Sequence, residues 1–170
     1  MCNHYHLLVR VAFPMLRPFA GGIQQSYAQY HHRRHGTTGV VWRGRYSTRP
    51  VEEDLSLTRC GRYIERNPVR AGMASLAWDW PFSSAAFYAL GRSDTVTDID
   101  PQYSPPALDG AQRAEYAAML ADVGDDLWMA DQRGPAIGSA AFAGRWLEQS
   151  GRPRLRQGRR PTSQVARVSM

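Results

Sequence analysis

The chain has 170 residues, of which 43% are hydrophobic and 21% charged, a composition typical of a globular domain that excludes a wholly disordered or fibrous chain. No stretch reaches the roughly 18 apolar residues of a membrane span and no basic, apolar leader opens the chain, so we expect a cytoplasmic protein with no membrane partner. Two cysteines, Cys2 and Cys60, cannot form a disulfide framework and are expected to be reduced thiols.

Charge is sorted along the chain. All 21 basic residues are arginine, and the formal net charge is +6. Residues 1–75 hold 11 arginines and 4 acidic residues. Residues 76–144 hold 3 arginines and 10 acidic residues, and residues 145–170 hold 7 arginines and 1 acidic residue. Such blocks indicate an anionic polymer as partner, and the planar guanidinium group, which suits phosphates and guanine edges, favours nucleic acid.

The first predicted elements are a strand and a long helix. Apolar, β-prone residues predict a strand over residues 4–11. Apolar side chains at helical spacing predict a helix over residues 15–35, with Gly36 at its C-terminal cap. Residues 40–46 are expected to form a strand or an extended basic loop.

The second predicted helix begins near Pro50, with acidic residues 52–54 in its first turn, where the helix dipole favours them. It is expected to end at Asn67, because Pro68 disfavours helical geometry at the residue before it.

The C-terminal half is predicted to contain helices over residues 111–123 and 139–150, the second with Ser139 as its N-cap. Before them, an apolar cover over the core is expected from Trp78, Trp80 and Phe82.

The pair His4 and His6 is the first candidate site. Side chains alternate along a strand, so both imidazoles lie on one face and form half of a divalent-metal site. The alternative is a pair of surface or packed histidines.

Tyr63 is the second candidate. It lies four residues before Asn67, on one face of the predicted helix. Arg62, Arg66 and Arg70 surround it in the sequence, an environment that favours a phenolate and can hold phosphates. The alternative is a core aromatic whose hydroxyl lies at the rim.

These segments together resemble the REP-associated tyrosine transposases, a family of the HUH single-tyrosine endonuclease class. The resemblance covers most of the chain, most loosely over residues 88–130. The matching motifs are Met1-Cys2-Asn3-His4-Tyr5-His6-Leu7-Leu8-Val9, Tyr27-Ala28-Gln29-Tyr30, Arg33-Arg34-His35-Gly36, Trp42-Arg43-Gly44-Arg45-Tyr46, Tyr63-Ile64-Glu65-Arg66-Asn67-Pro68-Val69-Arg70-Ala71-Gly72, Trp80-Pro81-Phe82-Ser83-Ser84, Gly134-Pro135-Ala136-Ile137-Gly138-Ser139 and Gly158-Arg159-Arg160-Pro161.

The resemblance implies an α+β fold, in which an antiparallel sheet with flanking helices forms an HUH endonuclease-like catalytic core with a ferredoxin-like centre. We expect this core over residues 1–90, a linker over 91–110, a helical region over 111–151 and a basic, disordered tail over 152–170.

The resemblance also implies a chemistry. The family's two histidines bind Mg²⁺ or Mn²⁺, here through His4 and His6, and the ion acts as a Lewis acid on the scissile phosphate. Tyr63 matches the nucleophile, which forms a 5′-phosphotyrosine link and releases a 3′-hydroxyl, so strands are cleaved and rejoined without ATP. Asn67 matches a third, amide-type ligand, and a helix C-cap is the alternative for an asparagine before proline.

The implied substrate is single-stranded DNA folded into hairpins of palindromic repeats, bound by a nucleoid-associated bacterial protein that is a monomer or a homodimer. For Trp42, core packing and DNA reading are equally open. The residues expected to contact DNA are Tyr30, Arg33, Arg34, Trp42, Arg43, Arg45, Arg62, Arg66, Arg70, Arg159 and Arg160.

Family members usually carry several tens of residues before the histidine strand. Because His4 is the fourth residue here, we expect an N-terminally incomplete chain, through either an internal methionine taken as the start or a truncated gene. Two functions follow: a metal-dependent DNA nickase and strand transferase, or a catalytically inactive remnant that only binds DNA.

Overall fold

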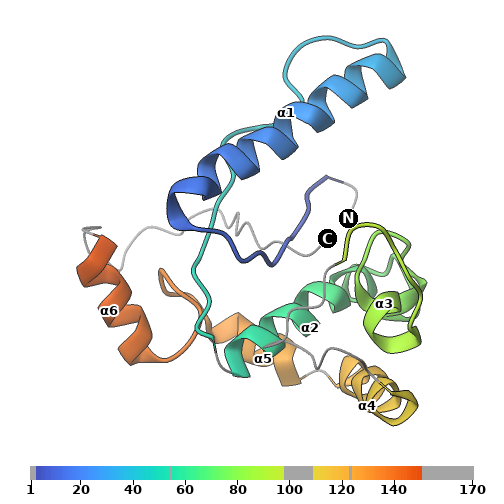
Figure 1. Ribbon diagram of the computed structural model, residues 1–170, viewed down its shortest axis with the longest axis vertical. Coiled ribbons are helices and arrows are strands. Elements are labelled where there is room, and N and C mark those ends of the chain that lie inside the picture. The colour runs from blue at the N-terminus through green and yellow to red at the C-terminus, as the bar shows by residue number, and fades with distance from the viewer. Residues whose placement is uncertain (1–2, 54, 98–108, 123, 151–170) are drawn as a thin grey trace. The chain divides into compact units, whose positions relative to one another are not determined.

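The protein is described here by a computed structural model, in which residues 3–53, 55–97, 109–122 and 124–150 are placed. Helices dominate these residues (Figure 1). Their bounds, in chain order, are α1 Leu16–His35, α2 Leu55–Arg70, α3 Ala85–Leu90, α4 Gly110–Ala121, α5 Gly124–Asp131 and α6 Ala140–Ser150, with the short 3-10 helices η1 Phe13–Met15 and η2 Ala77–Asp79.

The predicted α+β fold is wrong. The described residues contain no β-strand and therefore no antiparallel sheet, only isolated bridges such as the parallel pair Val51 and Ile137. Residues 4–11 have the composition of a strand, but a strand forms only where a neighbouring backbone pairs with its N–H and C=O groups. No strand elsewhere in the described residues supplies that partner. Residues 40–46 form an irregular loop rather than a strand.

The described chain divides into two compact units. Residues 9–47 form the first, called here the α1 unit, and the remaining described residues form the second, called the α2–α6 unit. The segment before residue 9, which includes His4 and His6, belongs to the α2–α6 unit.

The α1 unit is a long helix followed by a loop that folds back on it. The predicted helix and its cap are confirmed, since α1 is followed by Gly36 in the left-handed conformation with a φ of 62°. The loop is held by Trp42, whose Nε1 donates a hydrogen bond to the carbonyl of Gln24 at 2.8 Å.

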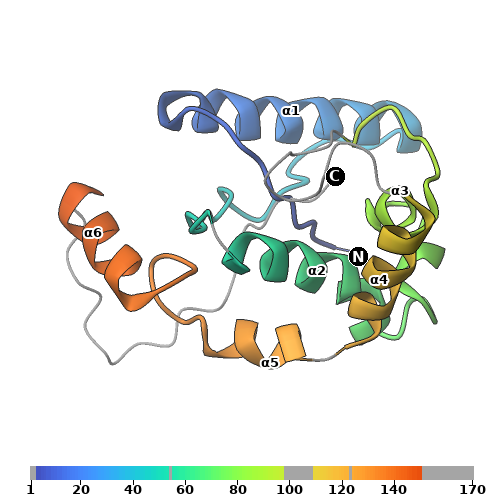
Figure 2. The same ribbon diagram turned by 60° about the horizontal axis from the view of Figure 1, so that its bottom comes forward.

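Helix α2 is the centre of the other unit and lies between two apolar clusters. α5 runs alongside α2, and α4 lies beside α3 (Figures 1 and 2). The cluster toward α5 contains Cys60, Ile64, Met129 and Ile137. The cluster toward α3 and α4 contains Ala77, Ala85, Tyr88, Ala89, Tyr116 and Leu120.

Helix α2 begins at Leu55 and not near Pro50 as predicted. Glu52, which was expected in its first turn, has a different partner. Glu52 lies before the helix, where its N–H donates to the carbonyl of Ile137 at 2.9 Å. Its carboxylate accepts a hydrogen bond from the backbone N–H of Ser139 at 2.7 Å. The residues expected to open α2 therefore join the start of α6 instead.

The predicted end of α2 was also wrong, because the helix continues through Pro68 to Arg70. Proline lacks the N–H that would bond the carbonyl of Ile64, and this loss normally breaks a helix. Here Nδ2 of Asn67 donates to that carbonyl at 3.4 Å and to the carbonyl of Tyr63 at 2.8 Å. The asparagine side chain thus supplies the donor that the proline removes.

The two predicted C-terminal helices are confirmed as α4 and α6, with bounds that differ by at most two residues. Ser139 caps α6 by accepting a hydrogen bond from the N–H of Phe142 at 3.1 Å. Helices α3 and α5 were not predicted. Most of the predicted linker and the whole basic tail, with Arg159 and Arg160, lie outside the described residues, so these boundaries stay predictions.

The predicted apolar cover is only partly built. Trp78 packs against the α3–α4 cluster. Phe82 is 82% exposed and contacts the ring of Trp80 edge to face at 5.9 Å, so these two rings do not close over the core together.

Candidate functional site

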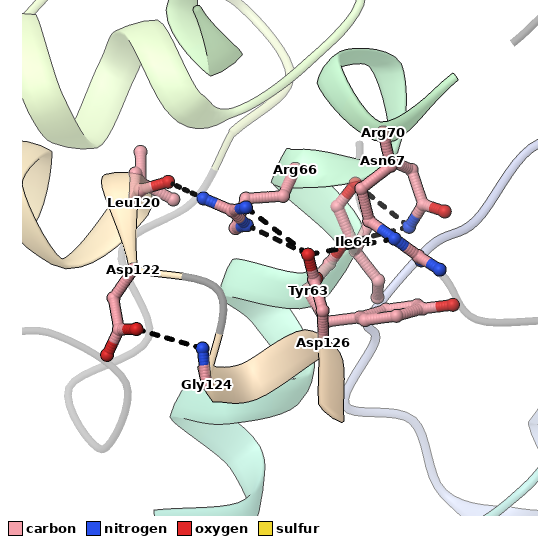
Figure 3. A network of polar contacts seen from close by, with 9 residues as sticks. All are labelled: Tyr63, Ile64, Arg66, Asn67, Arg70, Leu120, Asp122, Gly124 and Asp126. Carbon is pink, nitrogen blue, oxygen red and sulfur yellow. Dashed lines mark hydrogen bonds and ion pairs between the residues drawn. The ribbon is translucent and has the colours of Figure 1, made fainter. Parts of the chain in front are cut away.

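Tyr63 lies on α2 with different surroundings on each side of its ring. The ring packs against the cluster of Cys60, Ile64, Met129 and Ile137. Over it lies the guanidinium group of Arg70, 4.7 Å from the ring centroid (Figure 3). The side chain of Arg70 is 41% exposed, so solvent and ligands can reach this cation beside the phenol. This geometry is compatible with both interpretations of Tyr63, as a nucleophile and as a core aromatic whose hydroxyl lies at the rim.

Asn67 lies one turn after Tyr63 and is nearly buried. Its amide nitrogen bonds the helix backbone, and Figure 3 shows its amide oxygen on the same side of α2 as the Tyr63 hydroxyl. The C-cap alternative is wrong, because α2 runs three residues beyond Asn67. The role of its oxygen as a metal ligand stays a prediction.

Arg66 is bound within the fold. Its guanidinium group donates to Oδ2 of Asp126 at 3.3 and 3.2 Å and also to the carbonyl of Leu120 (Figure 3). The ion pair is largely buried, with the Arg66 side chain 8% exposed. Arg70 lies 3.7 Å from the same carboxylate. Arg66 thus fixes α2 to α4 and α5, and its predicted contact with DNA would compete with these bonds.

Arg62 also contacts α4, through a hydrogen bond from Nη1 to the sulfur of Met119 at 2.6 Å. Arg62, Arg66 and Arg70, the three arginines predicted to contact DNA from α2, therefore differ in accessibility. Only Arg70 combines the contact with Tyr63 with a partly exposed side chain.

Glu65 is a buried carboxyl group that the sequence reasoning did not single out. It is 1% exposed, and its two oxygens accept hydrogen bonds from Ser84 Oγ at 2.6 Å and Tyr116 Oη at 2.8 Å. Burial raises the pKa of Glu65 to about 7, against the lowering effect of the two hydrogen bonds and of Arg62. The available signal was the small or rigid residues one turn away on its helical face, Gly61 and Pro68, which are typical of a buried face.

His4 and His6 lie close together on the extended N-terminal segment. Their ring centroids are 5.0 Å apart, edge to face, and His4 Nδ1 lies 2.7 Å from Oδ1 of Asn3. Two residues further on, Leu8 packs against the same apolar cluster as Tyr63. The segment that carries the histidines is therefore part of the unit that contains Tyr63.

The spacing of these imidazoles suits one shared ion. An ion about 2.1 Å from a nitrogen of each ring lies roughly 3 Å from each ring centroid, so centroids 5.0 Å apart can be bridged. Two imidazoles are half of a ligand set, and the described residues hold no group of three or more His, Cys, Asp or Glu that could bind a metal. The two histidines therefore fit an open metal site, in which an amide oxygen, water and phosphate would complete the ligand set.

The α1 unit contains most of the other predicted DNA contacts. Residues 9–47 include six arginines, three histidines and no acidic residue. Tyr30, Arg33, Arg34, Arg43 and Arg45 are all exposed. Trp42 packs against Tyr27 with ring centroids 5.2 Å apart and is fixed by its hydrogen bond to α1, so its geometry is that of a packing residue.

Comparisons with known proteins give no relative: no family model, no curated protein and no solved structure matches the chain. Within the described residues, no helix is both long enough and apolar enough to cross a membrane.

Proposed function

We propose that the chain cleaves and rejoins single-stranded DNA, with Tyr63 as the nucleophile. One observation carries the proposal: the paired imidazoles of His4 and His6 belong to the same compact unit as Tyr63, over whose ring lies the guanidinium group of Arg70. The hairpin form of the substrate follows from the resemblance alone. The proposed site would combine residues of α2 with residues of the N-terminal segment.

Tyr63 would attack the scissile phosphorus through its phenol oxygen. A Tyr63 Oη–P bond forms, the bond from phosphorus to the 3′-oxygen breaks, and the phenol proton is lost while the leaving oxygen gains one. The product is a 5′-phosphotyrosine link with a free 3′-hydroxyl. Attack by a 3′-hydroxyl on that link reverses the step, and the phosphodiester energy is kept for rejoining.

Arg70 would hold the anionic phosphate beside the phenol, since a guanidinium group binds phosphate oxygens through paired hydrogen bonds. His4, His6 and the amide oxygen of Asn67 would hold Mg²⁺ or Mn²⁺. When bound, such an ion supplies Lewis-acid polarisation of the phosphate.

The test is covalent capture of a labelled single-stranded hairpin on a denaturing gel in the presence of Mn²⁺. Tyr63→Phe should abolish the adduct and leave hairpin affinity within about twofold, because phenylalanine keeps the ring that packs on α2 and under Arg70. Tyr46→Phe is the matched control and should leave the adduct intact. An adduct that persists in Tyr63→Phe and disappears in Tyr46→Phe contradicts the assignment.

A second candidate function is DNA binding without cleavage. The acid-free composition of the α1 unit favours it, because phosphate binding needs only positive charge on the surface. The same gel separates the two functions: hairpin binding by the unaltered chain with no adduct, at any Mg²⁺ or Mn²⁺ concentration, supports the binding function alone.

A further inference from the structure

A second pair of imidazoles lies at the C-terminal end of α1. His31 and His35 are four residues apart and share a face of the helix, with ring centroids 4.6 Å apart. This spacing is slightly closer than the 5.0 Å between His4 and His6. His31 is half-buried and His35 is exposed. Two histidines at this helical spacing can bind one zinc ion through their imidazoles.

Thr37 orients the first of these rings. Its hydroxyl oxygen lies 3.4 Å from Nδ1 of His31, just after the helix end. A contact at one imidazole nitrogen fixes the ring and leaves the other nitrogen to bind a metal. For His31 that other nitrogen is Nε2.

The neighbouring His32 differs in its contacts. Its Nδ1 lies 3.2 Å from the Thr37 hydroxyl, and its Nε2 lies 3.1 Å from the carbonyl oxygen of Gly39. Both of its nitrogens therefore have partners in the loop that follows α1. His32 makes a natural control, because it is adjacent in sequence, equally half-buried and engaged in the fold.

We propose that His31 and His35 form a binding site for a transition-metal ion that prefers imidazole, with Zn²⁺ as its representative. The chemistry favours this class, because residues 9–47 contain no carboxylate, Mg²⁺ and Ca²⁺ prefer oxygen ligands, and imidazole suits Zn²⁺. Two imidazoles leave the remaining coordination positions to water or to anionic oxygens. The proposal does not rest on the chemistry of Tyr63.

The experiment titrates the full chain, carrying His4→Ala and His6→Ala, with ZnCl₂ by isothermal calorimetry. These two changes remove the N-terminal imidazole pair, and one Zn²⁺ per chain should still bind. Adding His31→Ala or His35→Ala should weaken this binding about tenfold or more, because each change removes a ligand. Adding His32→Ala should change it by less than about twofold.

A second measurement identifies the nitrogens. In long-range ¹H–¹⁵N spectra of the same parent chain, Zn²⁺ should shift Nε2 of His31 and a ring nitrogen of His35, and leave both nitrogens of His32 in place. Absence of saturable Zn²⁺ binding in the parent chain, or a loss on His32→Ala equal to that on His31→Ala, would overturn the proposal. Neither result bears on the adduct formed by Tyr63, so the two proposals fail separately.

Discussion

At the scale of single residues, Glu65 is a carboxyl group held in an unusual, almost fully buried environment. Its carboxyl group is enclosed between α2 and α4 and held by two hydroxyl groups, Ser84 Oγ and Tyr116 Oη. Burial disfavours the charged form, and the hydrogen bonds only partly offset this cost. The folded protein therefore keeps the Glu65 proton to a higher pH than the unfolded chain does.

The stability of the protein should fall as pH rises through this range. The pKa of Glu65 is about 7 in the fold against an ordinary value of 4.5, so the stabilisation from the bound proton is complete below about pH 4.5 and is lost as pH passes 7. The shift corresponds to about 3 kcal/mol in the free energy of unfolding. Urea denaturation of the parent and of Glu65→Gln across pH 4.5–8 measures it, since glutamine does not titrate.

Glu115→Gln on the exposed side of α4 is the control for this experiment. It should leave the pH dependence of the parent unchanged. If Glu65→Gln and the parent lose stability in parallel between pH 4.5 and 8, the buried carboxyl group does not hold its proton as described.

At the scale of elements, α2 shows how one side chain can preserve a helix through a proline. Asn67 donates to the carbonyls of Tyr63 and Ile64, the second of which would otherwise lack a donor at Pro68. The last turn of α2 places Arg70 over the ring of Tyr63. This turn depends on the Asn67 side chain, which donates in place of the backbone N–H that Pro68 lacks.

A double-mutant cycle should reveal this exchange of donors. Asn67→Ala should lower the free energy of unfolding by about 1–3 kcal/mol, because it leaves a buried carbonyl without its donor. In a Pro68→Ala background the residue at 68 regains an N–H for the carbonyl of Ile64, so the same change should cost about 1 kcal/mol less. Chemical denaturation of the four proteins gives the coupling, and additive costs would show that the two positions act independently.

At the scale of the whole molecule, charge is divided between the two compact units. The α1 unit has no acidic residue, whereas the acidic residues of the described chain all lie in the α2–α6 unit, where several bind arginines or backbone N–H groups. Arg66 is neutralised in this way by Asp126. The exposed arginines of the α1 unit have no carboxylate within their own unit, so they are the charges best placed to meet phosphate.

Replacing Arg33 and Arg34 together by glutamine should therefore weaken binding to single-stranded DNA of any sequence. Each lost phosphate contact lowers the slope of log affinity against log salt by about 0.7, so the slope should fall by about 1.4. Fluorescence anisotropy over a salt series measures it. The control is the double change Arg92→Gln and Arg133→Gln, two exposed arginines of the acidic part of the chain, which should leave the slope unchanged. Equal changes in both double variants would contradict a division of roles between the units.

Local chemistry was readable from the sequence alone. The helix that ends at Gly36 and the cap at Ser139 follow from rules that act within one turn, and both were predicted. His4 and His6 were predicted to be neighbours because of their spacing within a strand; the strand is not formed, but their ring centroids still lie 5.0 Å apart. The separation of charge into blocks, which becomes a property of the α1 unit, was visible in the same way.

Other features depended on partners far away in the chain, and only the tertiary structure decided them. The predicted strand over residues 4–11 has no pairing strand among the described residues, so the sheet inferred from resemblance is not formed there. Glu65 and Arg66 stand side by side in the sequence as ordinary charged residues, yet their burial is set by Tyr116, Ser84 and Asp126, which lie 19 to 60 residues away. The chemical groups of a side chain determine which bonds it can make. The packing of distant segments determines whether a bonding partner lies within reach.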